Sequence, residues 1–243
     1  MTARKTVLVV DAGGHSLEPA AQRLRLLGIP ALRAKTGGEA RAALADARAA
    51  VGVVLVPPDL PTLDLARALR ALRTTPGGAQ LPVLVAGPRP DASLRARLRS
   101  AGAALALWEP FDDHSVRFQV NRALAGHAPP VVPRRAERVP TPWPVEVRIG
   151  GRARPARVYT VSARGAFLAT AGPSLRRALV HVTLPLPGED LRVSGEVAST
   201  NVPGNLRRRN LPIGMGVRFL GLSPSAEEAL LAYTKQRALE LLV

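Results

Sequence analysis

The chain has 243 residues, which is enough for two domains of ordinary size. Hydrophobic residues make up 47% of it, so we expect packed cores and exclude an intrinsically disordered protein. It contains no cysteine, which excludes disulfides and thiolate metal sites. The longest apolar runs are short and interrupted by proline, glycine or arginine, so we expect no membrane span, no signal peptide and a cytoplasmic protein.

The formal net charge of +16 is spread evenly along the chain. Residues 1–125 carry 17 basic and 10 acidic groups, a net +7, and residues 126–243 carry 17 and 8, a net +9. Such a charge suggests an anionic partner, either nucleic acid, a membrane surface or a nucleotide. Only three of the basic residues are lysines, and arginine together with much alanine is also typical of a GC-rich coding sequence. The charge alone therefore does not predict DNA binding.

Residues 6–125 alternate short apolar runs with segments of helical periodicity, which predicts a parallel α/β sheet. We expect five strands, near residues 7–10, 31–34, 53–56, 83–86 and 104–107. A helix is expected after each strand, the second across residues 39–49, and Gly28 and Gly102 are placed to end the first and the fourth. Five such units predict a flavodoxin-like, doubly wound domain over residues 1–125.

Residues 126–141 are expected to form an extended linker that is stiff in part, because six prolines fall between positions 129 and 144. Beyond it, residues 142–243 predict a small antiparallel barrel. About six strands are expected, near residues 145–149, 156–161, 165–170, 179–184, 191–200 and 213–220.

The barrel is expected to be followed by a terminal helix that reaches about residue 242. Ser223 is suited to be its N-cap, Pro224 its first residue and Glu227 an acid of its first turn. The apolar residues of this segment exceed one narrow stripe, which suggests a helix-mediated contact such as a homodimer.

Three segments of the first domain carry a resemblance to a known family. They start at Leu55, Leu81 and Glu109, and read LVPPDLP, LPVLV and EPFD. In this order and spacing they resemble the receiver domain of two-component response regulators over the whole of residues 1–125.

Phosphoryl transfer to a receiver needs carboxylates that hold Mg²⁺, an aspartate nucleophile and a lysine. The residues at the corresponding positions do not supply this chemistry: Asp11 with Ala12 after the first strand, Pro57 at the acceptor, Ala86 or Gly87 after the fourth strand, and Glu109 in place of the lysine. Asp59 is the alternative acceptor, but it lies two residues further into the loop. We therefore predict a pseudo-receiver, a docking or dimerisation module that accepts no phosphate.

Two motifs stand at the start of the second domain. They are an RxxxR segment with Arg134, Arg135 and Arg138, and a segment with Thr160, Ser162 and Gly165 at the end of a predicted strand. With a six-stranded barrel behind them, they resemble the PilZ domain over roughly residues 133–243. That family binds cyclic di-GMP through RxxxR and [D/N]xSxxG, so the resemblance implies this ligand.

The residue types suit the ligand. A guanidinium offers a fork of donors to guanine O6 and N7 or to phosphate oxygens, and its flat face stacks on a base. Arg134 and Arg138 are the two motif arginines, and Arg135 is a third candidate. Ser162 would offer a hydroxyl, and Gly165 would allow a base or phosphate to approach the backbone closely.

Position 160 departs from the family pattern. An aspartate or asparagine there could meet the guanine edge and also hold an arginine, whereas Thr160 has one hydroxyl on a β-branched stem. Loss of one charge-assisted hydrogen bond costs about 1.5–3 kcal/mol, roughly ten- to a hundredfold in affinity. The alternative is that the arginine segment is a solvated basic linker and Thr160 an ordinary strand residue.

Nothing else in the sequence assembles an active site. The four histidines have no ligand spacing, and Ser162 has no nearby histidine or lysine to activate it. We therefore predict a non-enzymatic effector that needs no metal or cofactor. It would bind cyclic di-GMP and relay the signal to an unidentified protein partner, with an output in motility or surface behaviour. The alternative is a ligand-independent protein–protein interaction module in which both domains are degenerate, and non-specific DNA association ranks last.

Overall fold

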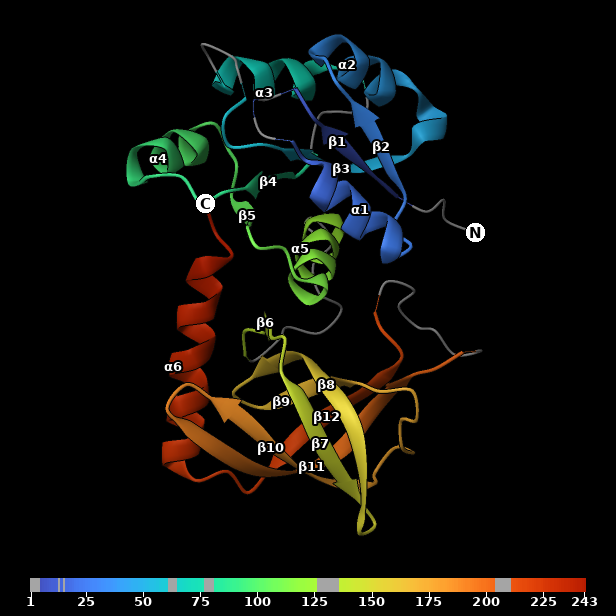
Figure 1. Cartoon of the computed structure of the whole chain (residues 1–243), viewed down its shortest axis with the longest axis vertical. Coiled ribbons are helices and arrows are strands. Elements are labelled where there is room, and N and C mark those ends of the chain that lie inside the picture. The colour runs from blue at the N-terminus through green and yellow to red at the C-terminus, as the bar shows by residue number, and fades with distance from the viewer. Residues whose placement is uncertain are drawn as a thin grey trace. The chain divides into compact units, whose positions relative to one another are not determined.

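A computed structural model of the chain describes residues 5–12, 14, 16–60, 65–76, 81–125, 136–203 and 211–243. The chain divides into two compact units, which are Met1–Ala128 with Glu240–Val243, and Pro129–Leu239 (Figure 1). The first unit is a parallel α/β sheet, and the second is a closed antiparallel barrel with a terminal helix. This confirms the predicted fold class.

The first unit alternates strands with helices along the chain. In order they are β1 (Thr6–Val10), α1 (Glu18–Leu26), β2 (Ala31–Ala34), α2 (Gly37–Ala45), the 3₁₀ helix η1 (Ala47–Ala49), β3 (Val51–Val56), α3 (Leu65–Thr74), β4 (Val83–Gly87), α4 (Ala92–Ser100), β5 (Leu105–Trp108) and α5 (Asp113–Ala125). The parallel strands follow the order β2-β1-β3-β4-β5, which is the flavodoxin-like order. The second helix, expected across residues 39–49, ends at Ala45, and η1 follows it.

The sheet of the first unit is covered on both faces. Successive strand residues point to opposite sides, so Val7 and Val9 pack with α1 and α5 while Leu8 and Val10 pack with α2, α3 and α4. Figure 1 shows α1 and α5 together on one side of this sheet. Burial on both faces explains why β1, β3, β4 and β5 read as apolar runs in the sequence, whereas the edge strand β2 contains the exposed Arg33.

The second unit contains seven strands and one helix among the described residues. They are β6 (Val139–Pro140), β7 (Pro144–Ile149), β8 (Arg152–Ser162), β9 (Gly165–Ala169), β10 (Leu179–Leu186), β11 (Glu189–Asn201), β12 (Gly214–Leu220) and α6 (Pro224–Glu240). The strands pair in the order β6-β8-β7-β10-β11-β12-β9, and β8 also pairs with β9, which closes β7 to β12 into a six-stranded barrel. The sequence predicted these six strands but not β6, which lies inside the segment expected to be linker.

Helix α6 belongs to the barrel core over most of its length. The Ser223 hydroxyl accepts a hydrogen bond from Ala226 N at 3.2 Å, as its predicted N-cap role requires. Leu230 is fully buried in the core cluster of the barrel, and the Tyr233 ring lies 4.7 Å from that of Trp143. Residues 240–243, which the sequence assigns to the barrel domain, group with the first unit. Of the helices in the described residues, none is long and apolar enough to cross a membrane.

The barrel is narrow, and strand β12 can pass its neighbours only because two of its residues have no side chain. A Cβ at Gly214 would lie 2.1 Å from the carbonyl oxygen of Leu168, and one at Gly216 would lie 2.6 Å from Ser199 Oγ. The first of these clashes is with backbone, which cannot rotate away. The Gly-Met-Gly sequence of β12 is therefore a packing requirement.

We expect Gly214→Ala to destabilise the barrel by about 1–3 kcal/mol, because the new methyl group overlaps a strand backbone. Denaturant unfolding followed by tryptophan fluorescence measures this. The matched control is Gly172→Ala, whose Cβ would meet only Arg154 Nη1 at 3.6 Å, and which should change stability by less than about 0.5 kcal/mol. Equal unfolding midpoints for the two variants would contradict the packing role of Gly214.

Candidate functional site

The two sequence motifs of the second unit meet at strand β8. Strand β6 pairs antiparallel with β8, with Val139 opposite Val161 and Pro140 opposite Thr160. This register brings Arg138, the residue before β6, to the edge of the sheet. There its Nη1 donates to Thr160 Oγ1 over 3.4 Å, across a separation of 22 residues. The hydrogen bond is long and therefore weak, but it joins the arginine segment to the second motif.

The entry of the chain into the barrel is held from two sides. The buried Thr141 donates its hydroxyl to Val158 O at 2.8 Å and its backbone N–H to Tyr159 O at 3.3 Å. On the other side Arg237, from α6, donates through Nε to Pro140 O at 3.4 Å. The backbone next to the half-buried Arg138 is therefore anchored to the barrel.

The hairpin between β8 and β9 is built around Ser162 and Gly165. The Ser162 hydroxyl donates to Gly165 O at 3.1 Å and accepts from Arg164 N at 3.4 Å. A Cβ at Gly165 would lie 2.3 Å from Val217 O on the neighbouring strand. Both residues are thus required by the hairpin itself, whether or not a ligand binds. Substitution of either residue would disturb the folding of the hairpin, so a loss of ligand binding in such a variant would not show that the residue contacts the ligand.

Thr160 stands at the position where the family pattern has aspartate or asparagine. Its side chain is 5% exposed, and its hydroxyl already accepts a hydrogen bond from the motif arginine Arg138. It thereby performs one of the two tasks expected of a planar acceptor at this position, which is to hold an arginine. The interaction is with a neutral hydroxyl, so it lacks the charge assistance that an aspartate would add.

The predicted site residues are thus partly brought together. Arg138 and Thr160 are in contact, and Ser162 and Gly165 lie in the adjoining hairpin, while Arg134 and Arg135 lie outside the described residues.

Sequence reasoning missed two arginines at this end of the barrel. Arg164 is exposed in the hairpin, and its position between the serine and glycine of the second motif was a usable signal. Arg237 acts on β6 from 97 residues away, so no motif spacing could have indicated it.

The first unit has its candidate site at the carboxyl ends of the parallel strands, where such sheets bind ligands. Pro57 is buried directly after β3, and Pro58 packs over the end of β4. A Cβ at Gly87, which has φ +144°, would lie 2.9 Å from Pro58 Cδ. The proline ring therefore takes the space that a hydroxyl side chain at position 87 would need. Asp59 and Glu109 are both exposed.

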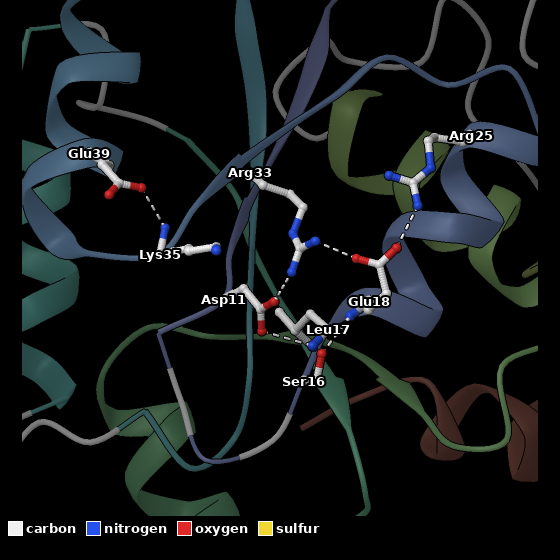
Figure 2. A network of polar contacts seen from close by, with 8 residues as sticks. All are labelled: Asp11, Ser16, Leu17, Glu18, Arg25, Arg33, Lys35 and Glu39. Carbon is white, nitrogen blue, oxygen red and sulfur yellow. Dashed lines mark hydrogen bonds and ion pairs between the residues drawn. The ribbon is translucent and has the colours of Figure 1, made fainter.

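An arginine neutralises the carboxylate that remains at this site (Figure 2). Asp11 follows β1, and its side chain is only 9% exposed. Its Oδ1 accepts from Leu17 N at 2.9 Å, and its Oδ2 pairs with Nη2 of Arg33, which projects from β2. The other arm of the Arg33 guanidinium pairs with Glu18. Both oxygens of Asp11 are therefore engaged by groups of the protein.

The same network perturbs two titrating groups. The pKa of Glu18 is held below its usual value, first by a hydrogen bond from Arg25 at 2.5 Å and then by the charges of Arg33 and Arg25. The pKa of Arg33 is raised, first by its hydrogen bond to Asp11. A lowered carboxyl pKa means that Glu18 stabilises the fold above its unfolded pKa, and that this contribution is lost as the pH falls through the lower folded value. The network is therefore intact at neutral pH.

The described residues include no group of three or more histidine, cysteine, aspartate or glutamate side chains that could hold a metal ion.

Comparison with known proteins finds a family match in the second half of the chain and similar solved structures. Residues 133–236 match the family model of the PilZ domain, and a comparison with curated proteins found no match. Among solved structures the chain is similar to the chemotaxis protein CheY4 of Vibrio cholerae, with 21% identity and a TM-score of 0.43 over 50% of this chain and 99% of that chain.

Two further solved structures are similar. The receiver domain of the sensor histidine kinase PA1611 from Pseudomonas aeruginosa has 22% identity and a TM-score of 0.43 over 51% of this chain and 99% of that one. The inhibitor of motility of Bacillus subtilis has 19% identity and a TM-score of 0.37 over 46% of this chain and 57% of that one.

PilZ domains and receiver-like domains are typically binding and signalling modules. The strand order of the first unit is the one that receivers share with flavodoxins. From residue 133 to residue 236 the chain matches the PilZ domain, a family of cyclic di-GMP effectors, and an α/β domain with the flavodoxin-like strand order precedes this segment.

Proposed function

We propose that the chain is a signalling effector that binds cyclic di-GMP at the hairpin end of the barrel. The observation that carries the proposal is the contact between Arg138 and Thr160, because it joins the two motifs at one place. The family match supports the class of ligand. In this proposal Arg134, Arg135 and Arg138 surround the ligand, and the hairpin of β8 and β9 forms the surface beneath it.

The chemistry of the site favours a dianionic ligand with flat bases. Cyclic di-GMP carries two phosphodiester charges and two guanines, which guanidinium groups can meet by paired hydrogen bonds and by stacking. Arg164 adds a further exposed guanidinium in the hairpin. Because Arg138 is already held against β8, less side-chain entropy is lost when the ligand arrives.

We propose that the first unit serves as a docking module for a protein partner and accepts no phosphate. Pro57 supplies no nucleophile at the acceptor position, and Arg33 supplies a fixed positive charge next to Asp11, where a receiver would bind its metal ion. Ligand binding at the barrel would then be relayed to the partner. An output in motility or surface behaviour is what the family resemblance implies.

A second candidate function is a protein-interaction module that binds no nucleotide. Thr160 favours it, because a neutral hydroxyl replaces the acidic or amide side chain of the family motif.

We expect the intact protein to bind cyclic di-GMP with micromolar affinity in calorimetric titration. The Arg134→Ala/Arg138→Ala variant should bind at least a hundredfold more weakly, since two charge-assisted contacts are removed. The matched control is Arg148→Ala/Arg152→Ala, which removes the same charge at the other end of the β7–β8 hairpin and should bind normally. Arg152 lies about 25 Å along β8 from Thr160, and Arg148 of β7 is paired with its neighbour Ala153. Equal affinity of the two double variants would contradict the site. No heat with the intact protein, and no change in its melting temperature, would favour the interaction module.

Thr160→Asn is expected to tighten cyclic di-GMP binding roughly ten- to a hundredfold, because it restores a planar acceptor for the guanine edge and for Arg138. Thr160→Val keeps the shape of the buried side chain and removes only the hydroxyl, so it should weaken binding. The same titration measures both. An affinity unaffected by either change would mean that position 160 does not face the ligand.

The receiver-like unit should take up no label from acetyl phosphate in the presence of Mg²⁺, and Mg²⁺ should not raise its melting temperature. Arg33→Ala should also take up none, because no nucleophile is created. It should instead lower stability by about 1–3 kcal/mol, since the shielded Asp11 carboxylate loses its partner. Arg41→Ala, an exposed arginine on α2, is the control and should be neutral. Label uptake that disappears in Asp59→Ala would contradict the proposal.

A further inference from the structure

The residues that directly follow α6 lie in the first unit and form part of its core. Leu241 and Val243 are 4% and 5% exposed, and Leu242 between them is half-buried. This alternation is that of a strand at the edge of a sheet. The end of the chain, marked C in Figure 1, lies beside α4 and β5.

The backbone of this segment pairs with the outer edge of β5. Leu242 forms an antiparallel bridge with Leu105. Ala106 N donates to Leu241 O at 3.1 Å, and Val243 N donates to Ala104 O at 3.4 Å. Strand β5 is the last of the five parallel strands, so without this pairing its outward N–H and C=O groups would lack sheet partners.

Two polar side chains from different helices hold the segment by its backbone. Gln119 of α5 is fully buried, and its Nε2 donates to Ala106 O at 2.8 Å and to Leu241 O at 2.6 Å. Arg99 of α4 donates through Nη1 to Val243 O at 2.8 Å. A buried amide on an apolar helix face is costly unless it is hydrogen-bonded. The nitrogen of the Gln119 amide meets this need at the two peptide carbonyls, whereas its Oε1 has no hydrogen-bond partner among the described residues.

The apolar side chains of the segment complete one face of the sheet. Val243 belongs to the core cluster that includes Leu98, Ala101 and Ala106. Burial of a valine or leucine side chain is favourable relative to its exposure to water. The edge of β5 and the two helices thus contact both features of an extended apolar segment, its backbone and its alternate side chains.

We propose that the outer edge of β5, between α4 and α5, is a docking site for an extended apolar peptide, and that residues 241–243 of the same chain occupy it. Recognition is by strand addition, in which main-chain hydrogen bonds give affinity and pockets for alternate residues give specificity. The receiver-like unit is in this way a peptide receptor, independently of any phosphate chemistry and of cyclic di-GMP binding. An extended apolar peptide from another protein can bind the edge of β5 only after residues 241–243 have dissociated from it.

The pairing of residues 241–243 with β5 has a functional consequence because these residues directly follow α6, most of which belongs to the second unit. The chain passes from the first unit to the second between Ala128 and Pro129 and returns between Leu239 and Glu240. A tethered segment acts at an effective concentration of about millimolar, so it excludes weaker peptides from the edge. Release of the segment is therefore the event that exposes β5 to a partner.

The test uses the full chain and a fluorescent peptide with the sequence of residues 239–243. Leu241→Asp/Val243→Asp should release the segment and bind the peptide at least tenfold more tightly than the unchanged protein does. A peptide with aspartate at the two corresponding positions is the control and should not bind. Equal binding by the two proteins, or binding by neither, would overturn the proposal.

Amide hydrogen exchange followed by NMR gives a second readout. The Ala106 amide should exchange at least tenfold faster in the double variant and in Gln119→Leu, while the Leu107 amide, which faces β4, should be unchanged. Protection of Leu55 in the central strand reports whether the unit is folded. If the double variant unfolds, Arg99→Ala is the deciding variant, because it removes the side chain that holds Val243 O. The Val243 amide should then exchange faster than in the unchanged protein. Unchanged exchange, or protection that rises with protein concentration as a dimer forms, would overturn docking within one chain.

Discussion

The candidate ligand site depends on the short antiparallel pairing of β6 with β8. Only two residue pairs form it, yet the register of Pro140 against Thr160 decides where Arg138 must lie. Hydrogen bonds from Thr141 and Arg237 anchor this part of the chain to the barrel, so the backbone position of the nearby Arg138 is fixed. A proline-rich segment with no such anchor would leave the arginines to be ordered entirely by the ligand, at a cost in affinity.

The two motifs of the barrel show that residues in a binding pattern can serve the fold first. Gly165 is required because a Cβ at this position would clash with the Val217 carbonyl oxygen. Ser162 closes the same hairpin by a hydrogen bond to Gly165 O. A domain that had lost its ligand would still need both residues. The arginines and position 160 therefore carry the information about ligand binding, and Thr160 is the point at which this chain differs from the family pattern.

The first unit combines a flavodoxin-like scaffold with an unusual set of residues at the carboxyl ends of its strands. Pro57 and Pro58 remove both the nucleophile and the room for a hydroxyl residue at the end of β4. Arg33 pairs with both Asp11 and Glu18. The core beneath these loops is unaffected, because the strands are buried by their own apolar residues on both faces. Residues 241–243 pair with the outer edge of β5 and cover it.

The sequence by itself determined the succession of elements and the class of both domains. Periods of two and of 3.6 residues, with Gly28, Gly102 and Ser223 at helix ends, are local signals that survive without tertiary context. The two motifs of the barrel, and the proline at position 57, could also be read directly from short stretches of sequence. Three contacts were decided only by the tertiary structure: Arg138 with Thr160, Arg33 with Asp11, and Gln119 with the backbone of Leu241. These contacts join residues 22 to 122 positions apart, and they depend on strand register and on which strand forms the edge of a sheet, which no short-range pattern encodes.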